Sequence, residues 1–179
     1  MKRSSSDIIA LLVYVDDVVL TGNSIVEMNA IKAHLHSRFH IKDPGPIKYF
    51  LGLEVSRSLD GLVLNQRKYC LDLISETRML GFKPAPTPSD PSIKLHADEG
   101  ALLPDHSSFR CLIGQLIYLA NIKPDISFVV QQLSQFVSSP REPHMQALWI
   151  IHYLKNDPRY GLLYKSNTSL KIQVFSDPD

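Results

Sequence analysis

The sequence contains only two cysteines, Cys70 and Cys111, in 179 residues. Two thiols are too few for a disulfide framework, and neither lies in a C-x-x-C pair or in a Cys/His cluster with zinc spacing. Long hydrophobic runs are also lacking: the longest, residues 8–15, is far shorter than the roughly 20 residues that span a bilayer. These absences argue against a secreted scaffold, a zinc module and a membrane span. They favour an intracellular protein of the cytoplasm, the nucleus or an organelle.

The chain also has little excess of charge of either sign. Lysine and arginine total 19 and aspartate and glutamate total 18, so the net charge is +1. This balance excludes a strongly basic tail and gives no charge-based support for nucleic-acid binding, which has to be argued from a site. With 44% hydrophobic and 21% charged residues, the composition is that of a globular protein.

Two β-rich runs, residues 8–15 and 18–20, are separated by Asp16 and Asp17. The pattern predicts a hairpin with both arms buried and the two aspartates in its turn. Two-residue hairpin turns prefer Asn-Gly or Asp-Gly, because these residues adopt positive φ easily. Asp-Asp lacks that freedom, so turn propensity does not explain the pair.

The first half of the chain continues with alternating helix and strand patterns. Ser24 and Glu27 form a capping-box pattern before a helix that is expected to run to about His40. A strand is expected over residues 49–55, and a turn at 59–61 leads into a second strand. A helix is then expected to end near residue 80, with Gly81 as its cap.

Residues 82–106 contain five prolines and little periodicity. This composition predicts an extended surface connection and a boundary between two packed units. After it, apolar residues at helical spacing follow Ser107, Pro124 and Pro143, which predicts a unit of three helices. Two further strands are expected at the C-terminal end without a partner sheet, and the seven scattered histidines are expected on solvated helix faces.

The aspartate pair is suited to binding a divalent cation. Adjacent carboxylates repel each other unless a cation neutralises them, and Mg²⁺ prefers oxygen ligands. Two-metal phosphoryl transfer uses carboxylates held on rigid elements in this way. A plain polar turn remains the alternative for an Asp-Asp pair taken alone.

The residues around the pair resemble a known family. Tyr14-Val15-Asp16-Asp17, between Leu-Leu-Val and Val-Val-Leu-Thr-Gly, resembles the catalytic hairpin of reverse transcriptases of Ty1/copia-type retrotransposon polyproteins. Residues 39–55 resemble the region that carries the primer grip, and residues 109–128 resemble thumb or connection helices. The resemblance runs in order over residues 8–179.

The resemblance implies roles for particular residues. Asp16 and Asp17 would be catalytic and would hold Mg²⁺ or Mn²⁺, with Tyr14 and Val15 near the nascent base pair. The strand with Phe50, Leu51, Gly52, Leu53 and Glu54 would position the primer terminus, or alternatively be an ordinary sheet edge. RNA or DNA template–primer and deoxynucleoside triphosphates would be the partners. Tyr69 and Trp149 are interpreted as core residues.

We therefore predict an α+β fold containing part of a reverse transcriptase palm in residues 1–81. A proline-rich linker at 82–106, a helical thumb or connection at 107–157 and the first strands of a ribonuclease H-like domain at 158–179 would follow. Asp177 would match the first carboxylate of that nuclease site, which is incomplete, so no nuclease activity is expected. Exposed sheet edges and faces predict marginal solubility.

The family also needs a third carboxylate and the nucleotide-binding fingers, both from an upstream segment. Only 15 residues precede Asp16, so the chain is expected not to polymerise DNA by itself. A non-catalytic or decayed remnant that binds nucleic acid or protein is the alternative function. An unrelated metal-binding α+β enzyme is a third hypothesis.

Overall fold

The computed structural model describes residues 2–3, 7–90, 92 and 95–167. The strand expected at 174–177, with Asp177, lies outside these residues. The described part confirms a mixed α+β fold with antiparallel strand pairs and five α-helices. It divides into two compact units, Met1–Leu51 and Gly52–Asp179. No helix among the described residues is long and apolar enough to cross a membrane.

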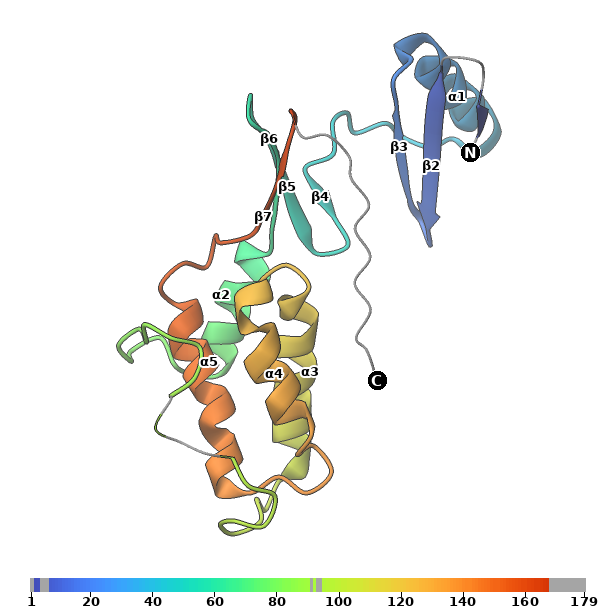
Figure 1. The fold of residues 1–179 in the computed structure, drawn as a ribbon. Helices are drawn as coiled ribbons and strands as arrows, with labels where there is room; N and C mark the ends of the chain where they lie inside the picture. The colour runs from blue at the N-terminus through green and yellow to red at the C-terminus, as the bar shows by residue number, and fades with distance from the viewer. Residues whose placement is uncertain (1, 4–6, 91, 93–94, 168–179) are drawn as a thin grey trace, which may run out of the picture. The chain divides into compact units, whose positions relative to one another are not determined.

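The first unit contains a three-stranded sheet and one helix (Figure 1). β1 (Lys2–Arg3), β2 (Ile8–Tyr14) and β3 (Asp17–Gly22) pair antiparallel in this order. α1 (Ile25–Phe39) packs against β3. Ser24 is its N-cap residue, as expected, but its side chain makes no capping hydrogen bond.

This unit has a small core. Among the described residues of this unit, only Ile9 is a buried hydrophobic residue, and no residue of α1 is buried. Val13 and Tyr14 of β2 are 59% and 53% exposed, so the expectation that both hairpin arms are buried is wrong. The physical reason is that one helix covers only part of one sheet face. The unit consequently presents apolar surface of the kind that proteins use for association.

The second sheet has the order β4-β5-β6-β7. Its strands are β4 (Tyr49–Phe50), β5 (Leu53–Arg57), β6 (Gly61–Asn65) and β7 (Leu162–Lys165). The single strand expected at 49–55 is therefore interrupted between β4 and β5. The interruption is a turn in which Leu51 and Gly52 have φ angles of 49° and 76°.

β7 corrects another expectation, because it does not lack a partner sheet. It pairs antiparallel with β6, from Gly61 opposite Lys165 to Leu64 opposite Leu162. The two strands approach so closely that a Cβ on Gly61 would lie 2.1 Å from the backbone oxygen of Tyr164. Glycine at this position therefore permits the pairing.

The helices of the second unit share one core. They are α2 (Arg67–Glu76), α3 (His106–Ala120), α4 (Ser127–Ser134) and α5 (Ala147–Leu154), with short 3₁₀ helices at Pro124–Ile126 and Glu142–Gln146. The buried members of the core are Cys70, Leu73, Ile74, Phe109, Leu112, Ile113, Leu116, Leu119, Ile126, Val129, Val130, Leu133, Ile150, Ile151 and Leu154. Because α2 contributes to this core, the compact units divide after Leu51, whereas the sequence indicated residues 82–106.

The end of α2 differs from the sequence prediction of a cap at Gly81. The helix ends at Glu76, and Arg78 takes the left-handed conformation with a φ of 57°. The Met79 N–H donates to the carbonyl of Ile74, at 3.3 Å, and the Arg78 N–H donates to that of Ser75, at 3.0 Å. This is a Schellman arrangement, which usually places glycine where Arg78 stands.

The segment expected to be a surface linker is fastened to α5 at its start. Lys155 Nζ donates hydrogen bonds to the carbonyls of Met79, Leu80 and Phe82. Further along, the Ala85 N–H donates to the His152 carbonyl, at 3.1 Å. The half-buried Lys155 amine thus supplies hydrogen bonds to backbone carbonyls that have no partner in a helix or sheet. These bonds hold an irregular segment in place.

The other end of the segment is held by residues around the 3₁₀ helix before α5. The Arg141 guanidinium donates to the carbonyls of Ala97 and Gly100, at 2.9 and 2.7 Å. His144 is fully buried, so the expectation of a solvated histidine is wrong at this position. Its Nδ1 accepts from the Arg141 N–H, at 3.0 Å, which leaves Nε2 to donate to the His96 carbonyl, at 3.1 Å.

The two cysteines are expected to differ in reactivity. Burial raises the pKa of the Cys70 thiol to about 11, whereas Cys111 is exposed. At pH 8 only about one Cys70 in a thousand would be a thiolate, and reagent access is blocked as well. We expect iodoacetamide to modify Cys111 at least about a hundredfold faster, as measured by peptide mass spectrometry. Equal rates in the folded chain would contradict the buried position, and denaturation in urea provides the control in which both react.

Candidate active site

The tip of the β2–β3 hairpin contains the predicted carboxylates. Tyr14 pairs with Asp17, so the two turn residues are Val15 and Asp16. The sequence had indicated Asp16 and Asp17 as the turn, and the structure corrects this by one position. The reason is the register of the arms, in which Val13 lies opposite Val18. Asp17 therefore begins a strand, where its backbone is held by pairing, and Asp16 lies in the turn itself.

The turn has an unfavourable backbone conformation. Val15 has a φ of 52°, a left-handed value that β-branched residues rarely adopt. Its side chain is 86% exposed, so no burial compensates for the strain. The cost is about 1–2 kcal/mol. Strain of this kind, in a turn that glycine or asparagine would form easily, is a feature of functional sites.

Replacing Val15 by glycine is expected to stabilise the hairpin by about 1 kcal/mol, because glycine adopts positive φ without steric cost. The measurement is amide hydrogen exchange of β2 and β3, which should slow about fivefold. Val13→Gly is the matched control, since Val13 is an exposed strand residue, and this change should speed exchange. Faster exchange in Val15→Gly would show that the turn is not strained.

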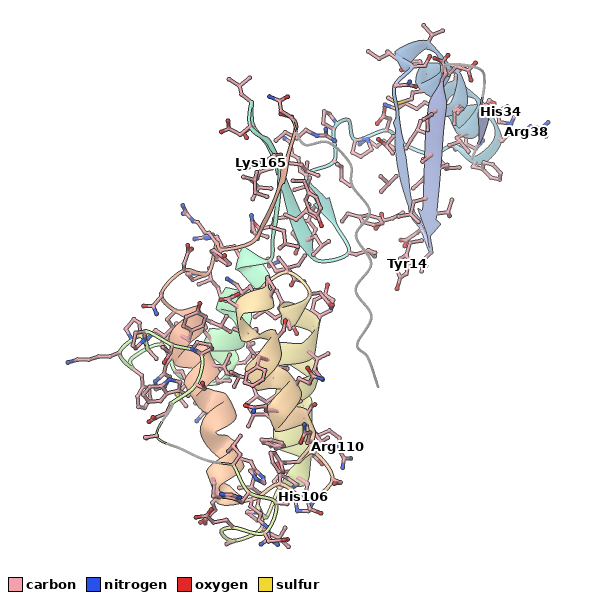
Figure 2. All side chains as sticks on the ribbon, in the orientation of Figure 1. Tyr14, His34, Arg38, His106, Arg110 and Lys165 are labelled. Carbon is pink, nitrogen blue, oxygen red and sulfur yellow. The ribbon has the colours of Figure 1, made fainter. Side chains whose placement is uncertain are left out.

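The side chains of Asp16 and Asp17 are both exposed at this tip. Figure 2 shows Tyr14 at the end of β2. Within the described part of the chain, neither carboxylate has a hydrogen-bond or ion-pair partner, and no group of three or more metal-ligating side chains is present. Two adjacent carboxylates with unused oxygen atoms fit Mg²⁺, which commonly takes one or two carboxylates together with water and substrate phosphates.

The comparison with protein families decides what this hairpin belongs to. The reverse transcriptase (RNA-dependent DNA polymerase) family matches residues 1–91, which include the whole of β2, the turn and β3. The chain belongs to this reverse transcriptase family. The resemblance drawn from the residues around Asp16 and Asp17 is therefore confirmed at the level of the family.

Relatives place this reverse transcriptase segment among copia-type retrotransposon polyproteins. The chain is 43% identical over 180 residues to the Retrovirus-related Pol polyprotein from transposon RE1 of Arabidopsis thaliana, covering 100% of the chain and 12% of that polyprotein. It is 29% identical over 188 residues to the corresponding polyprotein from transposon TNT 1-94 of Nicotiana tabacum, covering 99% and 14%. The chain thus spans a small part of these polyproteins. No solved structure matches it significantly.

A third relative is closer to this chain in length. The uncharacterized mitochondrial protein AtMg00810 of Arabidopsis thaliana is 37% identical over 171 residues, which cover 94% of the chain and 70% of that protein. The similarity extends well past residue 91, where the family match ends. The helical unit therefore belongs to the same homologous stretch as the hairpin.

The second candidate segment, residues 50–54, lies around the turn between β4 and β5. Phe50, Leu53 and Glu54 are half-buried, and Leu51 is 40% exposed. Glu54 has an evident structural partner: its carboxylate Oε1 accepts from the backbone N–H of Lys68, at 2.8 Å. A carboxylate in this position stabilises the N-terminus of α2, whose N–H groups carry partial positive charge.

The structure thus groups Tyr14, Val15, Asp16 and Asp17 at one hairpin tip, and residues 52–54 in the other compact unit. Two contacts of residues 52–54 are not predicted by the sequence. The N-terminus of α2 binds the Glu54 carboxylate, and the Tyr118 hydroxyl lies against Gly52. Both contacts join residues distant in sequence, and no periodicity or motif marks them. Tyr69 is half-buried and packs against the core, in line with the sequence interpretation.

Proposed function

We propose that this chain carries the catalytic hairpin of an RNA-directed DNA polymerase of the Ty1/copia type. The reaction is template-directed transfer of a nucleotide to a primer 3′-hydroxyl. The observation that carries the proposal is the family match over a strained hairpin tip with two exposed carboxylates, which have no partner among the residues that the structure describes. RNA or DNA template–primer and deoxynucleoside triphosphates are the corresponding substrates.

In this proposal Asp16 and Asp17 hold Mg²⁺ or Mn²⁺. When bound, the metal supplies positive charge that favours ionisation of the primer hydroxyl and departure of pyrophosphate. The chain's own contribution is placement: pairing of Tyr14 with Asp17 fixes the start of β3, and the tight turn sets Asp16 beside it. Tyr14, 53% exposed at the tip, and Val15 would face the nascent base pair.

The domain assignment follows from the same proposal. Residues 1–81 would belong to the palm, with residues 50–54 positioning the primer terminus. Residues 82–106 would connect it to a thumb or connection at 107–157, and residues 158–179 would begin a ribonuclease H-like domain with Asp177 as its first carboxylate. The shared core of α2 with α3, α4 and α5 implies that the second part of this palm segment is built onto the helical part.

The proposed site requires more than two carboxylates. Two-metal nucleotidyl transfer needs ligands that bridge two ions, and the described residues supply an adjacent pair without a third acidic neighbour. We infer that a further carboxylate and the nucleotide-binding fingers come from an upstream polymerase segment. The exposed apolar side chains of β2 are consistent with packing against such a segment.

Primer extension tests this function. Residues 1–179 are assayed on a primed RNA template with Mg²⁺, alone and together with the upstream polymerase segment of the RE1 polyprotein. Extension is expected only when the upstream segment is present. Extension by residues 1–179 alone would overturn the requirement for that segment. Salt-sensitive template binding that survives Asp16→Asn with Asp17→Asn, without extension in either case, would instead favour a non-catalytic nucleic-acid-binding module.

A further inference from the structure

The turn between β4 and β5 lies against the side chain of Tyr118. A Cβ placed on Gly52 would lie 2.6 Å from the hydroxyl oxygen of Tyr118, whereas the nearest ring carbon, Cζ, would be 3.7 Å away. The φ of Gly52 is 76°, which also favours glycine. The Tyr118 hydroxyl therefore occupies the space that a side chain at position 52 would need.

Tyr118 is itself held within the helical unit. It lies on α3 and is 39% exposed. Its ring meets that of Tyr69, on α2, edge to face with centroids 5.0 Å apart. The Tyr69 hydroxyl lies 3.4 Å from the Gln115 carbonyl of α3, and Gln115 Nε2 donates to the Glu76 carboxylate of α2, at 3.0 Å. The position of Tyr118 is thus set by the packing of α2 on α3.

Glu54 makes a second contact between this part of the chain and the helices. It lies two residues after Gly52, in β5, and its carboxylate accepts from Lys68 N–H at the start of α2. The chain entering β5 is therefore held at Gly52 by Tyr118 of α3 and at Glu54 by the start of α2. Both contacts lie within the second compact unit.

We propose that Tyr118 is a positioning residue for primer binding: its hydroxyl, lying against Gly52, holds residues 52–54 in register with the helical unit. This inference rests on the proposed primer-positioning role of residues 50–54. Glu54 acts by fastening the strand to α2, without contacting the primer. Because these two contacts join them to the helices, residues 52–54 move together with α2 and α3.

Amide hydrogen exchange of residues 53–55 in the full chain tests the contact itself. Gly52→Ala is expected to speed exchange, because its Cβ meets the Tyr118 hydroxyl at positive φ. Adding Tyr118→Phe removes that oxygen and leaves an ordinary 3.7 Å contact, so it should recover about tenfold of the lost protection. No recovery in the double variant would overturn the proposal.

Tyr118→Ala is expected to speed exchange at residues 53–55 by about tenfold while the buried core of α3 and α5 stays protected. Phe128→Ala is the matched control, since Phe128 is an aromatic residue of α4 that is 68% exposed. It should leave exchange at residues 53–55 unchanged. Equal effects of the two variants would also overturn the proposal.

Photocrosslinking distinguishes positioning from simple stability. A primer–template ending in 4-thiothymidine is expected to crosslink to residues 50–53 of the wild-type chain. Tyr118→Ala should reduce that yield about fivefold at saturating template, with less than a twofold change in affinity. An unchanged yield would overturn the role of Tyr118. Absence of the wild-type crosslink would contradict the proposed primer-positioning function, and the exchange measurements would still decide whether Tyr118 holds Gly52.

Discussion

Primer extension by the polymerase reconstituted with its upstream segment is expected to fall at least about a thousandfold when either Asp16 or Asp17 is replaced by asparagine. Asparagine keeps the size of the side chain and removes the charge that binds the metal. Because both side chains are exposed and without partners among the described residues, neither change should disturb the hairpin. The loss should therefore appear in the rate of nucleotide addition, with little change in thermal stability.

Asp60→Asn is the matched control for this prediction. Asp60 is an exposed aspartate in the turn between β5 and β6, and the hydrogen bonds shown for it run through its backbone atoms. Its replacement should leave extension within about twofold of wild type. Activity that survived in Asp16→Asn or Asp17→Asn would show that this pair does not hold the catalytic metal.

Leu73→Ala is expected to lower the free energy of unfolding of the helical unit by about 3 kcal/mol. Leu73 is 2% exposed and lies on α2, in the same core as buried residues of α3, α4 and α5. Loss of its side chain leaves a cavity in the core that α2 shares with α3, α4 and α5. Chemical denaturation followed by circular dichroism should show one transition, shifted as a whole to lower denaturant concentration.

Leu80→Ala provides the comparison, since Leu80 is 62% exposed and its replacement should change stability by no more than about 0.5 kcal/mol. The result also decides the boundary question raised by the proline-rich residues 82–106. If α3, α4 and α5 unfolded in a separate transition unaffected by Leu73→Ala, a boundary in that segment would be correct. The shared core would then not be a cooperative unit.

Local patterns predicted most of the secondary structure. The β-rich runs around Asp16 gave the hairpin, and apolar spacing at three and four residues gave α1 and the helices of the second unit. These signals succeed because they depend on neighbours in sequence. The one-residue error at the hairpin tip arose because polar character suggested the turn, whereas the pairing of Tyr14 with Asp17 determines it.

Contacts between distant segments were not predictable. β7 finds its partner in β6, about a hundred residues earlier, and nothing local to Leu162–Lys165 indicates this. The composition of the proline-rich segment predicts a surface connection, because no residue pattern indicates which groups bind its backbone carbonyls. The partners of these carbonyls include Lys155, directly after α5, and Arg141, directly before the 3₁₀ helix Glu142–Gln146.

In the candidate site, too, a local motif was predictable and contacts between distant segments were not. The motif around Asp16 and Asp17 indicated the family, which the comparison confirms. The capping of α2 by Glu54 and the contact of Tyr118 with Gly52 depend on packing between elements. The assignment of individual site residues to metal, nucleotide and primer remains a prediction. So does the marginal solubility expected from exposed apolar side chains.

A titration with Mn²⁺ shows whether the hairpin tip binds a metal ion. Mn²⁺ is titrated into residues 1–179 and free Mn²⁺ is followed by electron paramagnetic resonance, for the wild type, for Asp16→Asn with Asp17→Asn, and for Asp60→Asn. We expect binding by the wild type and by Asp60→Asn, and at least about tenfold weaker binding by the double variant, because its two metal-binding carboxylates are gone. Equal binding by all three would contradict the assignment of the hairpin tip as the metal site.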